Sequence, residues 1–132
     1  MKINTPISVG ELVDKLTILE IKSVMIKDKI KLAEVKNERV QLAEELEKIS
    51  DPSFSKSQLL ALKADLYETN LTLWRIEDNI RERERDNDFG SEFIRLARDV
   101  YYTNDKRFEI KSEINQLTNS DVKEVKSYES YS

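Results

Sequence analysis

Apolar residues recur every three to four positions along most of the chain, which predicts amphipathic helices. The first helix is expected to begin after Ser8, whose hydroxyl can accept from the amide of Glu11 while Glu11 bonds back, as in a capping box. A helix that is apolar on two sides belongs at the centre of a bundle or against a second subunit. One face of this helix carries Val9, Leu12, Val13, Leu16 and Leu19, and a second carries Ile18, Ile21, Val24 and Met25.

The apolar pattern becomes leaner after Ile26. It follows a near-heptad seam of Leu32, Val35, Leu42, Leu46 and Ile49, with Arg39 at the missing position. Neither Gly nor Pro interrupts residues 11–49, so we expect one continuous helix over about 9–49, straight or kinked and roughly 60 Å long. The alternative is a break near Lys27-Asp28, where Asp28 would cap a second helix.

Two polar segments, Ser50-Asp51-Pro52-Ser53 and Asp88-Phe89-Gly90-Ser91, separate the later helices. A capping box of Ser55 and Gln58 opens one helix, Ser91 is the expected cap of the next, and the last helix should stop near Asn119. The predicted fold class is an all-α antiparallel bundle of three long helices, or four if the first is broken, with coiled-coil-like packing. Residues 1–119 form this single domain, and residues 120–132 form a polar tail, disordered or loosely docked.

Composition excludes several classes of protein. With 2 Gly and 2 Pro in 132 residues, the chain lacks the turn residues that an all-β fold needs. It has no His and no Cys, which removes imidazole bases, thiol nucleophiles and Cys/His metal sites. The formal charge of −4 argues against nucleic acid as a partner. No membrane-spanning stretch or signal sequence is visible, so we expect a cytoplasmic protein. We also expect no cofactor and no metal.

Two catalytic alternatives carry little weight. An all-carboxylate magnesium site would use Glu44, Glu47, Glu77 and Asp78, but such pairs arise by chance in a chain with 26 acidic residues. A helical mutase of the chorismate type would clamp a dicarboxylate with Arg75, Arg81, Arg107 and Lys111, but the Arg/Lys spacing of that family is absent. We therefore interpret these side chains as solvated charge and expect no catalytic residue.

Two polar stretches are the best candidates for a binding site. Trp74, the only Trp, precedes Asp78 by one helical turn, and its N–H needs a partner such as Asn70 or Asp78 when buried. Asn104 lies on the apolar stripe of the last helix, beside Asp105 and Arg107, and should face inward. The structural interpretation is core packing at Trp74 and a register-fixing polar residue at Asn104. The functional interpretation is a ligand or partner site formed by Trp74, Asp78, Asn104, Asp105 and Arg107.

Four segments together resemble a family of small uncharacterised helical bacterial proteins, described as a domain of unknown function. The segments are residues 7–19 (ISVGELVDKLTIL), 73–78 (LWRIED), 100–107 (VYYTNDKR) and 124–128 (EVKSY). The resemblance covers nearly the whole chain and supplies no catalytic residue. It implies a loose link to glycosyltransferase and surface-polysaccharide gene neighbourhoods, and a tail that docks.

These observations predict a non-catalytic helical interaction or assembly protein that associates with itself as a homodimer. Another protein is the alternative partner. The prediction depends on the surplus apolar face of residues 9–26 and on the seam from Leu32 to Ile49. The alternative is a small-ligand protein, binding a nucleotide or nucleotide sugar, or an enzyme, with its polar site inside the bundle.

Overall fold

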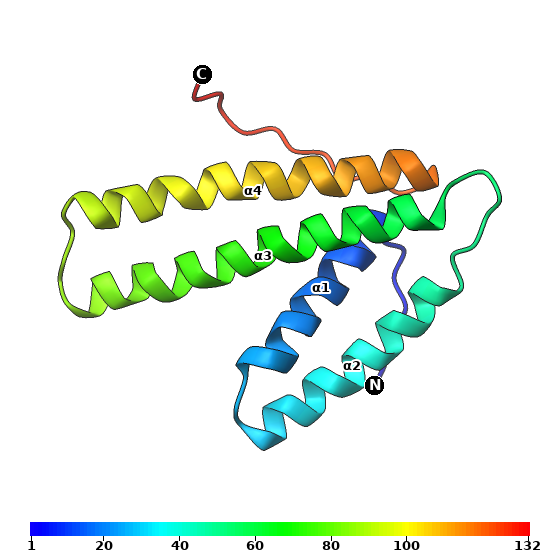
Figure 1. Cartoon of the computed structure of the whole chain (residues 1–132), viewed down its shortest axis with the longest axis horizontal. Helices are drawn as coiled ribbons and strands as arrows, with labels where there is room; N and C mark the ends of the chain where they lie inside the picture. Colours follow the sequence, from blue (N-terminus) through cyan, green and yellow to red (C-terminus); the bar gives the residue numbers. More distant parts are fainter.

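A computed structural model describes all residues, 1–132, as four helices without a strand (Figure 1). The helices are α1 (Val9–Met25), α2 (Lys29–Glu47), α3 (Lys56–Arg85) and α4 (Ser91–Thr118). Helices α3 and α4 form a long antiparallel hairpin, α1 packs against both of them, and α2 returns along α1. The predicted all-α bundle is confirmed.

Side-chain caps begin two of the helices where the sequence predicted them. The Ser8 hydroxyl accepts from the Glu11 amide at 3.0 Å, and the Ser55 hydroxyl accepts from the Gln58 amide at 3.3 Å. Helix α4 ends one residue before Asn119, whose left-handed conformation (φ 49°) terminates it. The predicted cap at Ser91 is wrong, because Ser91 is already the first helical residue and Gly90 precedes it without a side-chain cap.

The continuous first helix that we expected is wrong and the alternative, a break near Lys27-Asp28, is confirmed, because α1 ends at Met25 and α2 begins at Lys29. Ile26 has an extended backbone, and the Asp28 carboxylate accepts from the amides of Ile30 and Lys31, each at 3.0 Å. This side-chain cap starts a new helix without any Gly or Pro at the turn. The reversal folds α2 back onto α1 as a second helical hairpin (Figure 1).

Helix α1 lies at the centre of the bundle, as its two apolar faces predicted. It contacts each of the other three helices, and Val13 and Ile21 are almost completely buried. The main core cluster joins α1, α3 and α4 through Val13, Leu59, Leu66, Ile110 and Ile114. Burial of each such side chain contributes roughly 1.5–3 kcal/mol to folding.

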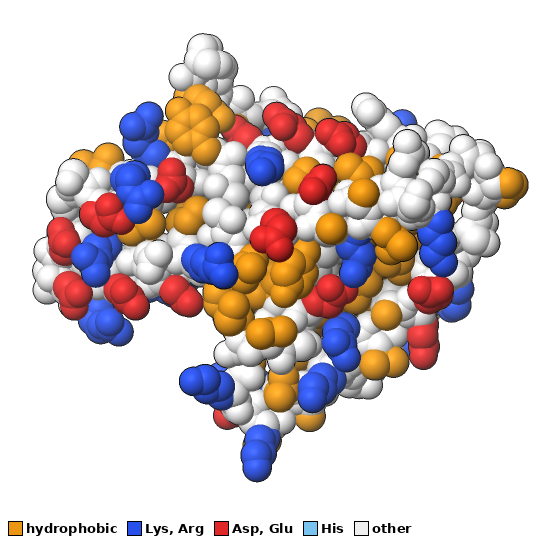
Figure 2. Space-filling view, viewed as in Figure 1, with side chains coloured by type: hydrophobic (Ala, Val, Ile, Leu, Met, Phe, Trp, Pro, Cys, Tyr) orange, Lys and Arg blue, Asp and Glu red, His pale blue; other side chains and the backbone are white.

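Beyond the reach of α1, the distal halves of α3 and α4 continue as a two-helix arm (Figure 1). Its tip carries acidic and basic side chains side by side (Figure 2), including ion pairs from Arg95 to Glu92 and Asp99. No helix of the protein is long and apolar enough to cross a membrane.

The tail beyond Asn119 has no regular secondary structure, yet it docks along α4. The Ser120 hydroxyl accepts from the amide of Val9 at 3.1 Å. Farther along, Glu124 pairs with Lys111 at 2.8 Å, and Lys126 pairs with Asp105. The tail therefore ties the start of α1 to α4 and covers part of the surface of α4.

Candidate functional site

Helix α2 is the least covered helix of the bundle. None of its 19 residues is buried, and it runs along α1 but along no other helix. Only its C-terminal end reaches farther, where Leu46 touches the core cluster and Glu47 pairs with Lys56 at 3.6 Å. One whole side of α2 is therefore exposed to solvent.

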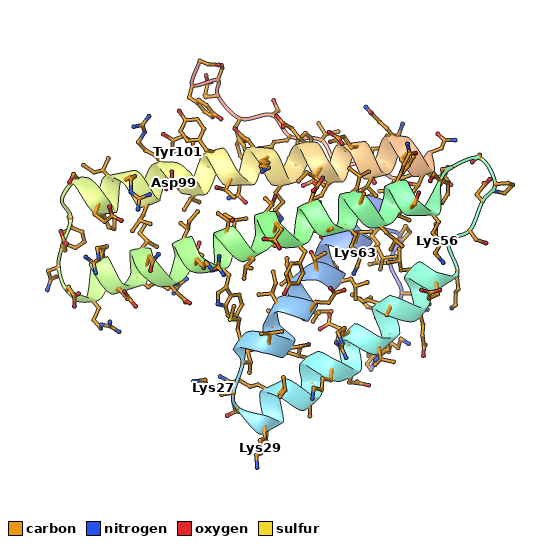
Figure 3. All side chains as sticks on the ribbon, in the orientation of Figure 1. Lys27, Lys29, Lys56, Lys63, Asp99 and Tyr101 are labelled. Atoms are coloured by element: carbon orange, nitrogen blue, oxygen red, sulfur yellow. The ribbon has the colours of Figure 1, made fainter.

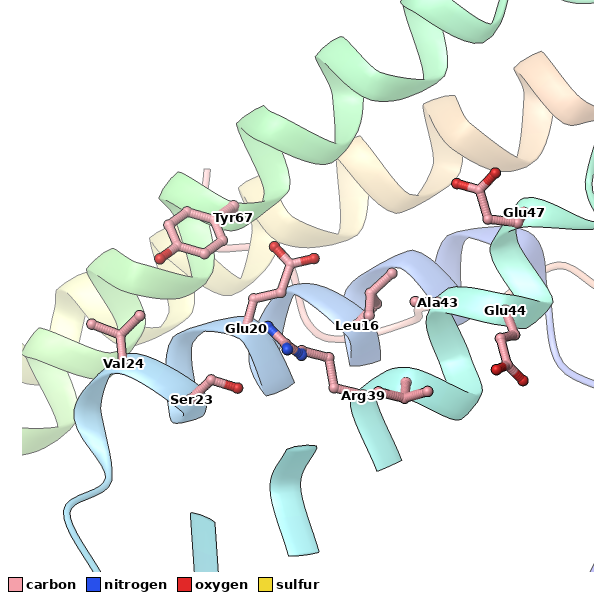
Figure 4. Close-up of a pocket in the computed structure, with 10 residues that line it drawn as sticks. Leu16, Glu20, Ser23, Val24, Arg39, Ala43, Glu44, Glu47 and Tyr67 are labelled. Carbon is pink, nitrogen blue, oxygen red and sulfur yellow. The ribbon is translucent and has the colours of Figure 1, made fainter. Parts of the chain in front are cut away.

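A groove of about 780 Å³ opens between α1, α2 and α3. Leu16, Val24, Val40, Ala43 and Tyr67 supply its apolar lining. Charged side chains of α1 and α2 also line the groove (Figure 4): Glu20 from α1, and Arg39, Glu44 and Glu47 from α2. Val24 is 72% exposed and Val40 is 50% exposed, so both apolar side chains are accessible to solvent at this groove.

The open side of α2 carries its own 3–4 spaced seam. Ile30, Ala33, Asn37 and Val40 are all exposed, with Ile30 at 76%, and this spacing is that of a coiled-coil interface with one polar position. Charge divides along the same helix. Residues 29–36 hold three lysines and one glutamate, whereas residues 37–47 hold four glutamates and one arginine.

A second candidate region is a buried polar network between α1, α3 and α4, centred on Asp14. The Asp14 carboxylate is fully buried and receives two parallel hydrogen bonds from Arg107, from Nε at 2.9 Å and from Nη2 at 2.5 Å. Asn70 donates to the same carboxylate at 2.9 Å and to the Thr17 hydroxyl at 2.9 Å. Every buried side-chain polar atom of the chain has a partner, as burial requires.

Lys111 extends this network towards the tail. Its side chain is only 6% exposed, and its ammonium lies 2.7 Å from a Glu11 oxygen, 2.8 Å from a Glu124 oxygen and 3.7 Å from an Asp14 oxygen. A lysine is rarely so buried unless carboxylates surround it. Glu124 is the most exposed of the three partners, at 42%.

The pKa values of the network follow from these contacts. Burial alone would raise the pKa of Asp14, but hydrogen bonds from Arg107 and Asn70 hold it below its ordinary value. Burial alone would lower the pKa of Lys111, but hydrogen bonds to Glu11 and Glu124 raise it. Asp14, Arg107 and Lys111 are therefore all charged at neutral pH.

Close contact between α1 and α4 positions this network. The Gly10 amide donates to the Asn115 carboxamide at 2.7 Å, and a Cβ at Gly10 would lie 2.5 Å from the Lys111 carbonyl oxygen. Only glycine permits this approach. It brings the first two turns of α1, which carry Glu11 and Asp14, against Arg107 and Lys111.

Four of the five residues predicted as a site line one pocket of about 450 Å³: Trp74, Asp78, Asn104 and Arg107. The pocket also contains Ile18 and Ile21 of α1. Asn70 uses its Nδ2 group to bond Asp14 and Thr17, and neither Asn70 nor Asp78, the two partners we expected, accepts a hydrogen bond from the Trp74 N–H. The side chains of Asp78 and Asn104 have no hydrogen-bond or ion-pair partner within the chain.

Asp105, the fifth predicted residue, faces the tail instead of this pocket. Its carboxylate accepts from Lys126 and, at 2.5 Å, from the Tyr131 hydroxyl. These hydrogen bonds lower the pKa of Asp105 and raise the pKa of Tyr131 to about 12. The Tyr131 ring packs against Tyr101 and Tyr102, so the end of the tail docks on the arm near Tyr101 (Figure 3).

The two catalytic alternatives find no assembled site. No three acidic side chains are placed to hold a metal ion, and the pairs Glu44/Glu47 and Glu77/Asp78 line different pockets. Of the four cations considered for a mutase-type clamp, Arg107 and Lys111 converge, but on Asp14. Arg81 pairs with Glu77, and Arg75 is exposed.

Sequence reasoning missed the residue at the centre of the network. Asp14 carries a signal, because it is a charged side chain next to Val13 on the apolar face of α1, within one turn of Leu12 and Leu16. Its partners Asn70 and Lys111 were each noted for another role, and only the packing of three helices shows that they meet at Asp14.

A family model described as "Family of unknown function (DUF6165)" matches residues 1–131. No curated protein and no solved structure matches the chain. The family match covers the open side of α2, the polar network and the docked tail.

Proposed function

Since the chain belongs to this family of unknown function over residues 1–131, its role follows from its own surfaces, and we propose that it is a non-catalytic, self-associating interaction protein. Two copies pair through the open sides of their α2 helices, which run antiparallel about a two-fold axis. The observation that carries the proposal is that α2 has no buried residue although it carries an apolar seam.

The division of charge on α2 favours a second copy as the partner. In an antiparallel pair, the lysine-rich half of each helix lies against the glutamate-rich half of the other. A parallel pair would set like charges against each other, which is unfavourable. A two-fold interface must be self-complementary, and α2 has this property along its whole length.

The shape of the open side fits the same arrangement. With Asn37 close to the two-fold axis, Ala33 of one copy faces Val40 of the other, so a small side chain meets a larger one. Lys29, at the outer tip of the hairpin (Figure 3), then approaches the partner's Glu44 at the edge of the groove. Two α1–α2 hairpins joined in this way form a four-helix layer.

The decisive experiment exchanges charges between two variants. One variant carries Lys29→Glu and Lys31→Glu, and the other carries Glu44→Lys and Glu45→Lys. Each variant alone should remain at the monomer mass of 15.5 kDa in light scattering, because like charges oppose in its antiparallel pair. An equimolar mixture should recover a species of twice that mass, since the two altered helices are complementary.

Lys106→Glu is the matched control, because Lys106 is an exposed lysine of α4 with no ion pair. It should associate as the wild type does. A wild-type protein that stays at 15.5 kDa at concentrations up to about 1 mM would contradict the proposal, since such a pair would be weaker than about −4 kcal/mol. Variants that pair as well as the wild type would contradict the antiparallel arrangement.

A further inference from the structure

We propose that the cleft under the tail is a binding site for the carboxylate of a small aromatic ligand, and that the Glu124 carboxylate occupies this position in the free protein. The cleft has a volume of about 530 Å³, and its cations are Arg107, Lys111 and Lys126. It lies on α4, away from the open side of α2, and therefore stands independently of the proposed self-association.

The cleft is built from anchored groups. Arg107 is fixed by its two hydrogen bonds to Asp14, which use Nε and Nη2. The third nitrogen of the guanidinium, Nη1, takes no part in them. Lys111 is more than nine-tenths buried, so its ammonium cannot swing out to solvent. Positions fixed before a ligand arrives lower the entropy cost of binding.

Glu124 differs from the other carboxylates of the region because it belongs to the tail. Glu11 and Asp14 lie on α1 and are held there by the helix. Glu124 is 42% exposed and reaches Lys111 from a segment without regular structure. Its carboxylate can turn away from Lys111 while Lys126 stays paired with Asp105 and the helices stay in place, so it acts as an intramolecular competitor.

The carboxylate of Glu124, which the ligand would replace on Lys111, sets the ligand charge at one negative unit. The three cations pair with three carboxylates that belong to the helices, those of Glu11, Asp14 and Asp105. Positive and negative charges among these six groups are therefore equal. Glu124 adds one further negative charge. A carboxylate replaces that charge one for one, whereas a doubly charged phosphate adds a second charge without a cation.

The neighbouring pocket supplies a place for an aromatic ring. Asn104 and Arg107 line both the cleft under the tail and the pocket of Trp74, so the two spaces are adjacent. The Trp74 indole offers an aromatic face, and the Asn104 carboxamide is free to bond a polar substituent. A ring bearing a carboxylate can thus span the two pockets.

The test uses benzoate as the probe and benzamide as its uncharged counterpart. Trp74 is the only tryptophan, so its indole N–H gives one resolved signal in a proton–nitrogen spectrum. Benzoate should shift this signal and the Lys111 amide in a saturable way, and benzamide should not. Glu124→Gln should tighten the Kd for benzoate by roughly tenfold, because the competitor is removed.

Glu129→Gln is the matched control, since Glu129 lies on the same tail and makes no ion pair. The substitution changes the net charge by the same amount as Glu124→Gln. It should leave the Kd unchanged, and Lys126→Gln should weaken binding without unfolding the bundle. Equal shifts from benzoate and benzamide would overturn the proposal. So would a Glu124→Gln protein that binds benzoate no better than the Glu129→Gln protein. A preference for inorganic phosphate over benzoate would overturn the choice of a carboxylate.

Discussion

The Asp14 carboxylate and the Arg107 guanidinium meet edge to edge across α1 and α4, with two hydrogen bonds between residues 93 positions apart in the chain. Such a pair specifies one relative orientation of the two helices, because both hydrogen bonds form together at only one angle. Asn70 joins the same carboxylate from α3. One buried side chain thus links the three helices that form the core.

We predict that this pair makes stability depend on acid pH. The pKa of Asp14 is lower in the folded state than its ordinary value of 3.8, so its contribution is complete above about pH 5 and is lost as the pH falls through the folded-state pKa. Asp14→Asn should cost about 3–5 kcal/mol at pH 7, since Arg107 is left without its partner, and should flatten the stability profile between pH 5 and 2. Urea unfolding at each pH measures both effects.

A double variant separates the pair from general damage to the core. Asp14→Leu combined with Arg107→Met removes both charges and keeps apolar volume. It should be more stable than Asp14→Leu alone. If the double variant is as unstable as the sum of the two single variants, the coupling between Asp14 and Arg107 is absent and the prediction is wrong.

The second prediction concerns the core under α3. Leu66 is fully buried in the main cluster, whereas Leu60 on the same helix is 51% exposed. Leu66→Ala should lower the free energy of unfolding by about 2–5 kcal/mol, through lost transfer energy and a residual cavity. Leu60→Ala is the control and should change it by less than about 1 kcal/mol. Equal losses at the two positions in urea unfolding would contradict the assigned core.

Local chemistry explains how far the sequence predicted the fold. The 3.6-residue periodicity, the caps at Ser8 and Ser55 and the stop near Asn119 are all properties of short segments, and the structure confirms them. The break at residues 26–28 was predicted only as the alternative, because the favourable cap at Asp28 competes with a helical pattern that continues through it. Only the packing of α2 back onto α1 decides between the two.

The candidate site was predicted in part for the same reason. Trp74 and Asp78 share a helix face, as do Asn104 and Arg107, so spacing alone pairs them within each helix. That the two pairs face one pocket depends on the register between α3 and α4, which no local signal gives. Asp105, one residue from Asn104, necessarily points elsewhere, towards the tail.

The third prediction tests the docking of the tail through Tyr131. Its hydrogen bond to Asp105 raises the pKa of Tyr131 to about 12, so among the five tyrosines one should ionise near pH 12. Asp105→Asn should move this pKa down towards 10, since the charged acceptor is lost. Carbon-13 spectra of labelled tyrosine, assigned with Tyr131→Phe, measure the change. Glu129→Gln should leave the titration in place, and a Tyr131 that ionises near pH 10 in the wild type would show that the tail is undocked.

The fourth prediction concerns the approach of α1 to α4 at Gly10. A methyl group there would lie 2.5 Å from the backbone carbonyl oxygen of Lys111 and 2.9 Å from the Asn115 side chain. Backbone cannot yield as a flexible side chain does, so Gly10→Ala should cost about 1–3 kcal/mol in urea unfolding. It should also weaken the Asp14–Arg107 pair, because the first turns of α1 must move away from α4.

Gly90 provides the matched control for this effect. It has an ordinary φ of −79° and lies at the start of α4 without a side-chain cap, and the nearest atom to an added Cβ is 3.4 Å away. Gly90→Ser should keep or raise stability, since serine supplies the missing cap. If Gly10→Ala unfolds at the same urea concentration as the wild type, α1 does not depend on close contact at this position, and the assigned packing of α1 against α4 is wrong.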